Sequence, residues 1–289
     1  MPAGNDAASG APDAFAAGNA EQGPLRLAQN RPPPSRRASR NIEAFWDPMT
    51  IQQVFPGLRS APAGAILTIA DHVFTLWGPA DEAFAELTRG YSNDLINQIR
   101  QVDPSYRYHN TGFPTTREGQ MNQIQTLRLD RAVAYYRKRN DAGPLQVETL
   151  RYLQERVDAQ YEVGLREAKA GRLKVKLSRE EALGNFIDLA VRRELRRFYN
   201  QLRISTQPGQ QVRVVGREYD SSGSDLTYRI PDARVGRIAF DVTLTRKTLK
   251  THQIIGFFNA DMRAVATIIV RPSQLGPNST YVIVRPERK

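Results

Sequence analysis

The sequence predicts an α+β protein, in which a helical N-terminal region is followed by a small α/β domain with a mixed sheet. Apolar residues recur with a period of about 3.6 between residues 42 and 203, which is typical of amphipathic helices. After Gly209 the period shortens to about 2, which is typical of strands. These patterns divide the chain into three parts: 1–40, 41–177 and 178–289.

The first part is rich in Pro, Ala and Gly and has almost no large apolar side chains. Such a composition buries too little surface to offset the entropy lost on ordering, so we expect a disordered lead. It also lacks the basic start and the apolar core of a secretory signal.

The second part is expected to be helical. Its apolar spacing and its proline and threonine caps predict four helices. They cover a mostly buried segment over 65–76, residues 79–102, a stretch capped by Thr115 or Thr116 that runs to Asn140, and residues 144–171.

The third part is expected to open with a long helix and to continue as a sheet. Ser178 and Glu181 have the spacing of a capping box, and the helix that they begin runs to about Leu202. One further helix is expected over 251–259, and strands are expected over 212–215, 226–231, 237–244, 267–270 and 281–284. This alternation is typical of an α/β layer.

Charge and composition narrow the classes of partner. The chain of 289 residues carries a formal net charge of +11, and from residue 178 onward 19 Lys and Arg face 11 Asp and Glu, a surplus of eight. Such a surplus favours nucleic acid as a partner, ahead of an anionic membrane.

The absence of cysteine excludes disulfides and thiolate metal sites, and three scattered histidines argue against a zinc cluster. A carboxylate site for a hard ion stays open, whereas no stretch approaches the ~20 apolar residues of a membrane span.

Three acids stand out by their positions in the third part. Asp232 follows an expected strand, and Asp241 lies within the next, where its neighbours face the other side of the sheet. Glu194 lies within the apolar stripe of the long helix. An acid that points at a core needs a cation, a metal or a donor, and three such acids are what a divalent ion needs to activate water. Each acid alone is more simply explained by a cap, a turn or an ion pair, and it is the set of three that favours a function.

Four segments of the third part resemble the restriction-endonuclease-fold toxin domains of bacterial polymorphic and type VI-delivered effectors, within the PD-(D/E)xK nuclease superfamily. The resemblance covers about Val212 to Pro286. It is carried by Tyr228-Arg-Ile-Pro-Asp232, Ile238-Ala-Phe-Asp-Val-Thr243, Thr251-His-Gln-Ile-Ile-Gly-Phe-Phe258 and Ile268-Ile-Val-Arg-Pro272.

The resemblance implies a metal-dependent nuclease. Asp232 and Asp241, with Glu194 as the acid of the first helix, would hold Mg²⁺ or Mn²⁺, and Gln253 would support them. The family's lysine, however, is replaced here by Thr243. Three interpretations follow: a lysine that has migrated to Lys247 or Lys250, catalysis without a lysine, or a domain that binds nucleic acid without cutting it.

The same resemblance implies the partners. DNA is the favoured substrate and RNA stays open. From their positions and charge, the residues expected to contact phosphate are Arg192, Arg193, Arg196, Arg229 and Lys250, and for Arg229 ordinary ion pairing is an equal alternative. A toxin of this kind is secreted by a specialised system or with a chaperone, acts in the cytoplasm of the target cell, and is neutralised by a cognate immunity protein. A protein- or membrane-interacting effector with a degenerate nuclease fold is the remaining alternative.

Overall fold

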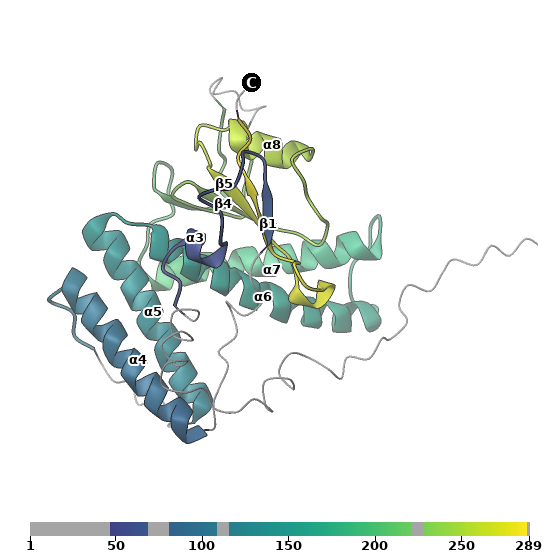
Figure 1. The fold of residues 1–289 in the computed structure, drawn as a ribbon. Helices are drawn as coiled ribbons and strands as arrows, with labels where there is room; N and C mark the ends of the chain where they lie inside the picture. The colour runs from purple at the N-terminus through teal and green to yellow at the C-terminus, as the bar shows by residue number, and fades with distance from the viewer. Residues whose placement is uncertain (1–46, 69–80, 109–115, 221–227, 288–289) are drawn as a thin grey trace, which may run out of the picture.

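The computed structural model describes residues 47–68, 81–108, 116–220 and 228–287 (Figure 1). The disordered lead expected over 1–40 lies outside these residues, as does most of the helix expected over 65–76. Within the described part of the chain, no helix is both long and apolar enough to cross a membrane.

Helices dominate the chain as far as residue 201. The short α3 (Ile51–Val54) precedes four long helices, which confirm the predicted segments from residue 79 onward. These are α4 (Asp81–Val102), α5 (Arg117–Arg139), α6 (Gly143–Lys169) and α7 (Arg179–Gln201). Helices α4 and α5 form a hairpin with an apolar cluster of its own, and it projects away from the sheet (Figure 1).

The predicted helix starts have a clear structural basis. Thr116 caps α5 by accepting a hydrogen bond from the Gly119 amide. Ser178 caps α7 in the same way, with the Glu181 amide as donor. The carboxylate of Glu181, however, accepts from the Leu177 amide rather than from that of Ser178, so only half of the expected capping box forms.

The strands form one six-stranded mixed sheet, which confirms the predicted fold class. Its order is β1-β6-β5-β4-β3-β2, and all neighbours are antiparallel except β4 and β5. Helix α8 (His252–Asn259) supplies the crossover that this parallel pair requires. The strands are β1 (Ile66–Thr68), β2 (Val212–Val214), β3 (Ala233–Val235), β4 (Ile238–Val242), β5 (Ala266–Val270) and β6 (Tyr281–Val284).

Two predictions about elements were wrong. Residues 66–68 form an edge strand paired with β6 rather than the start of a buried helix, because an apolar run this short fits either structure. The strand expected over 226–231 is represented in residues 228–231 only by an isolated bridge between Glu218 and Arg229. The strand beside β4 is instead β3, which joins it through a two-residue turn where Gly236 adopts a φ of 59°.

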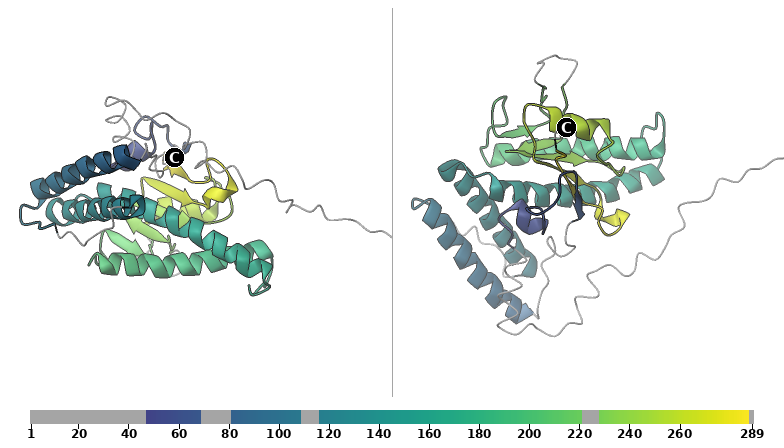
Figure 2. Two further views of the ribbon diagram at one scale, coloured as in Figure 1. Left: turned by 90° about the horizontal axis from the view of Figure 1, so that it is seen from below. Right: turned by 45° about the horizontal axis from the view of Figure 1, so that its top comes forward.

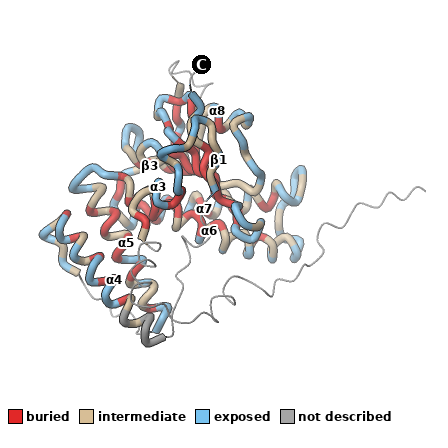
Figure 3. The backbone as a smooth tube through the Cα atoms, viewed as in Figure 1, coloured by how far each residue is buried: buried red, intermediate tan, exposed pale blue. Residues whose placement is uncertain are grey.

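The sheet is covered on both faces. Ile238 and Phe240 of β4 belong to the core shared with α6 and α7, whereas Ala239, between them, packs with α8. Figures 1 and 2 show these helices on opposite sides of the strands, and buried residues concentrate where they meet (Figure 3). The larger core also includes residues of α3 and α6, so the core does not divide at the boundary expected between residues 177 and 178.

Candidate active site

Two buried aspartates lie side by side at the end of β4. Asp241 belongs to β4 and is 1% exposed, and Asp232 immediately precedes β3 and is 3% exposed. The Val242 amide donates to Asp232 Oδ2 over 2.6 Å, which holds this carboxylate against the strand that carries Asp241. Because Phe240 faces α6 and α7, Asp241 points to the opposite face, toward α8.

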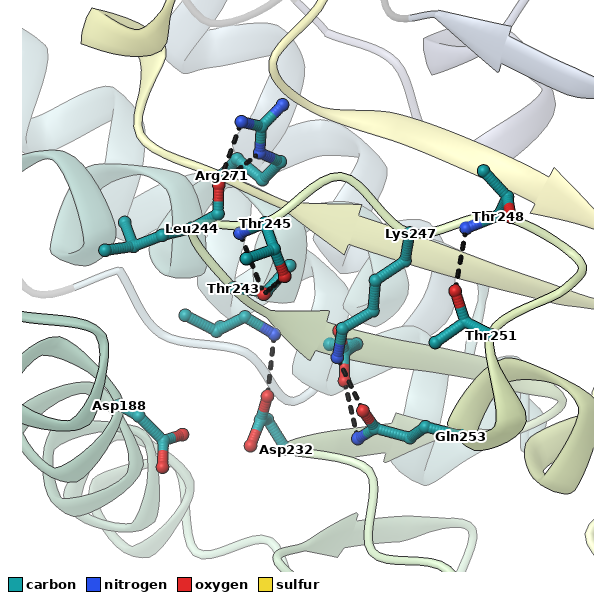
Figure 4. A network of polar contacts seen from close by, with 12 residues as sticks. Asp188, Asp232, Thr243, Leu244, Thr245, Lys247, Thr248, Thr251, Gln253 and Arg271 are labelled. Atoms are coloured by element: carbon teal, nitrogen blue, oxygen red, sulfur yellow. Dashed lines mark hydrogen bonds and ion pairs between the residues drawn. The ribbon is translucent and has the colours of Figure 1, made fainter. Parts of the chain in front are cut away.

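A lysine and a glutamine complete this side of the site (Figure 4). Lys247 Nζ lies 2.7 Å from Asp241 Oδ2 and donates to Gln253 Oε1 over 2.5 Å. Gln253, in the first turn of α8, donates from Nε2 to Asp241 Oδ1 over 2.8 Å. The structure therefore brings together Asp241, Lys247 and Gln253, whereas Lys250 is exposed and its side chain has no partner among the described residues.

The position of Lys247 depends on a turn that the sequence does not reveal. Strand β4 ends at Val242, and the chain turns back instead of continuing straight. The Tyr281 hydroxyl in β6 accepts from the Lys247 amide over 2.7 Å and donates to its carbonyl over 2.8 Å. Arg271 donates to the Leu244 carbonyl over 2.9 and 3.1 Å. These contacts bring the Lys247 side chain back beside Asp241.

The helical acid at this site is Asp188 rather than Glu194. Arg192 Nε lies 2.6 Å from Asp188 Oδ1 and donates to Asp232 Oδ1 over 2.8 Å, so one guanidinium joins both acids. Asp188 also faces Asp232 in Figure 4. The signal in the sequence was the spacing of four residues between Asp188 and Arg192, which places both on one face of a helix.

Glu194 lies on another face of α7 and contacts α6. It accepts a hydrogen bond from Gln160 over 2.9 Å, and Arg156 lies 3.8 Å away. At about 100° per residue, Glu194 is turned some 200° from Arg192, so its carboxylate cannot join that of Asp232. The sequence places Glu194 in the apolar stripe of the helix. That stripe faces the protein interior, but the part that carries Glu194 contacts α6 rather than the site.

Burial and mutual repulsion raise the pKa of two of the acids. The pKa of Asp188 rises from 3.8 to about 7, first through burial and then through the nearby charge of Asp232. Burial and Asp232 likewise raise the pKa of Asp241 to about 6, against the opposing effect of Lys247. Three carboxylates crowded in this way favour a cation among them.

The donor chemistry fits a hard divalent ion. The carboxylates of Asp188, Asp232 and Asp241 supply the oxygen ligands that Mg²⁺ and Mn²⁺ prefer. Asp188 Oδ1 and Asp241 Oδ2 are buried and lack an aligned hydrogen bond, although each contacts a cationic side chain. As arranged, the described residues contain no group of three acids or histidines spaced as ligands, and Arg192 and Lys247 contact the carboxylate oxygens of these acids.

The other side chains predicted to contact phosphate differ in whether they are exposed and unpaired. Arg193 and Arg196 are exposed on α7 and have no ion-pair partner among the described residues. Arg229 is half-buried, donates to the Tyr228 carbonyl, and packs so closely on Gly256 that a Cβ there would lie 2.3 Å from its Nε. Arg229 therefore anchors the segment before Asp232 against α8.

Comparison with protein-family models, with curated proteins and with solved structures finds no match for this chain.

Proposed function

We propose that this protein is a metal-dependent nuclease that hydrolyses phosphodiester bonds in nucleic acid. The observation that carries the proposal is the contact of Lys247 with Asp241 and Gln253, beside the buried Asp232. Buried acids, a lysine and a supporting glutamine are the set that the resemblance to PD-(D/E)xK nucleases requires, and here the lysine comes from a different position in the sequence.

The chain's own residues have separable roles in this reaction. A divalent ion held by Asp188, Asp232 and Asp241 would lower the pKa of a bound water and polarise the phosphate. Lys247 offers an ammonium donor where negative charge develops on the phosphate and the attacking oxygen. Gln253 holds this donor and Asp241 in one arrangement, so that little reorganisation is needed during the reaction.

The substrate surface extends along α7 from the site. Arg196 follows Arg192 by one helical turn, and Arg193 flanks both. The exposed guanidinium groups of Arg193 and Arg196 suit phosphate oxygens, and the surplus of eight positive charges from residue 178 onward attracts a polyanion. We favour DNA because of the resemblance, although RNA presents the same phosphates.

The biological setting proposed with this activity is that of an antibacterial toxin. It would be delivered into the cytoplasm of a competitor by a specialised secretion system, and an immunity protein with an acidic surface would cover the basic site. The helical region would then serve delivery or extend the substrate groove.

A second candidate function is nucleic-acid binding without cleavage. It is favoured by the pairing of all three carboxylates with Arg192 and Lys247, which leaves no assembled ligand set among the described residues.

Cleavage of plasmid DNA and of RNA in Mg²⁺ or Mn²⁺, with purified protein free of any immunity partner, tests the proposal. We expect wild-type protein to cut, and Asp241→Asn to bind DNA but leave it intact. If folded wild-type protein leaves both polymers uncut in both metals while it still binds them, the binding function replaces the nuclease.

A further inference from the structure

Arg192 lies where two acids of the site meet. Its guanidinium lies 2.8 Å from Asp232 Oδ1 through both Nε and a terminal nitrogen, and its Nε lies 2.6 Å from Asp188 Oδ1. The Asp232 side chain is 4% exposed, so it has no access to solvent cations in this arrangement. One positive side chain thus stands between two carboxylates that would otherwise repel each other.

The same guanidinium is within reach of solvent and of a substrate. One third of the Arg192 side chain is exposed, whereas the acids that it joins are more buried. The surface next to it carries the unpaired Arg193 and Arg196. A nucleic-acid backbone that lies along this surface would meet Arg192 next, and guanidinium groups bind phosphate as well as they bind carboxylate.

A divalent ion and Arg192 compete for the same oxygen atoms. Asp232 Oδ1 lies 2.8 Å from two guanidinium nitrogens, and Asp232 Oδ2 accepts from the Val242 amide, so an ion that binds the buried carboxylate of Asp232 through Oδ1 must displace Arg192. From this geometry we infer that Arg192 is a positioning residue that holds the place of the ion between Asp188 and Asp232, and that it moves to a substrate phosphate when nucleic acid binds. The inference rests on the proposed nuclease function.

Thermodynamic linkage follows from this exchange. Without substrate, an incoming ion must first break the contacts of Arg192 with both acids. When a substrate phosphate is present, Arg192 has already left the two acids for the phosphate. The ion and the nucleic acid therefore each strengthen the binding of the other by the same factor. The metal site would then assemble fully only on substrate.

Two measurements test the exchange with the full-length protein. Calorimetry gives the Mn²⁺ affinity without nucleic acid, and fluorescence anisotropy gives the affinity for a labelled duplex of phosphorothioate linkages with and without Mn²⁺. Arg192→Gln removes the competing charge. Arg193→Gln is the matched control, because it removes the same charge from the next residue of α7, where the side chain is exposed and unpaired.

We expect Arg192→Gln to bind Mn²⁺ about tenfold more tightly than wild type in the absence of duplex. Mn²⁺ should raise the duplex affinity of wild type and of Arg193→Gln by about tenfold, and that of Arg192→Gln by clearly less. Arg192→Lys, which keeps the charge but loses the planar fork, should be intermediate. This second variant decides the matter if Arg192→Gln does not fold.

The outcomes separate this inference from the nuclease function. If wild type cuts in Mn²⁺ but Arg192→Gln binds the ion no more tightly than wild type, only the role of Arg192 is overturned. If wild type binds no Mn²⁺ in either the presence or the absence of duplex, the proposed metal-dependent function is overturned as well.

Discussion

The two sides of the site hold their acids differently. Toward α8, Asp241 has a lysine and a glutamine of its own, and each of these partners also contacts the other. Toward α7, Asp188 and Asp232 share one guanidinium from the solvent-facing side of a helix. The first arrangement is closed, because each of its three side chains contacts the other two. The first side therefore has one cation for one acid, whereas the second has one cation for two acids, and we infer that this shared cation is the one that can be exchanged.

The largest effect is expected on the side of the site toward α8, at Lys247. Lys247→Met should lower kcat by about 10²- to 10³-fold, because it removes a positioned cationic donor from the reacting phosphate. Single-turnover cleavage measures the loss. Lys250, three residues away, is exposed and expected to contact phosphate, so Lys250→Met should raise KM at most and leave kcat like that of wild type. Equal losses in the two variants would mean that general basicity, rather than the contact with Asp241, explains the activity.

A smaller effect is expected when the support of that lysine is weakened. Tyr281→Phe removes both hydrogen bonds to the Lys247 backbone and should lower kcat about tenfold with little change in KM. Tyr152→Phe removes one hydrogen bond to the Glu194 carbonyl, away from the site, and serves as the control. Both variants should lose about 1 kcal/mol of unfolding free energy, and only the first should lose activity.

On the side toward α7, the contribution of Asp188 to the unfolding free energy should depend on pH. The folded-state pKa of Asp188 lies above its unfolded value, so stability falls as pH rises from about 4 through about 7. Asp188→Asn, whose amide can donate to Asp232, should stabilise metal-free protein by about 1 to 2 kcal/mol at pH 8 and by almost nothing at pH 4. Urea unfolding in a chelator measures this, and an equal gain at both pH values would contradict the assignment.

The smallest effect sharpens the contrast between the two acids of α7. Glu194→Gln should change stability by no more than about 0.5 kcal/mol and leave cleavage unchanged, because Gln160 and Arg156 hold it on the far side of the helix. Asp188→Asn should cut poorly under the same conditions. If instead Glu194→Gln abolishes Mn²⁺ binding while Asp188→Asn does not, the acid predicted from the sequence replaces the one found in the structure.

Local patterns in the sequence determined much of the fold. The caps at Thr116 and Ser178, the long helices that follow them, and strands β4, β5 and β6 are all encoded by neighbouring residues. Strand β3 was missed because three residues beside a tight turn carry too little periodicity. Strand β1 was mistaken for a helix because its pairing partner lies more than 200 residues further along the chain.

The sequence by itself also drew attention to Asp232 and Asp241, because their positions in successive elements are local information, whereas Gln253 was suggested only by the resemblance to PD-(D/E)xK nucleases. Only the tertiary structure decided between Lys247 and Lys250, and between Asp188 and Glu194. The lysine depends on a turn held by Tyr281, which lies 34 residues away. The choice of acid depends on which face of α7 meets Asp232 and which meets α6. Both the lysine and the acid are determined by packing between distant segments, and the pattern of apolar residues within one segment does not predict that packing.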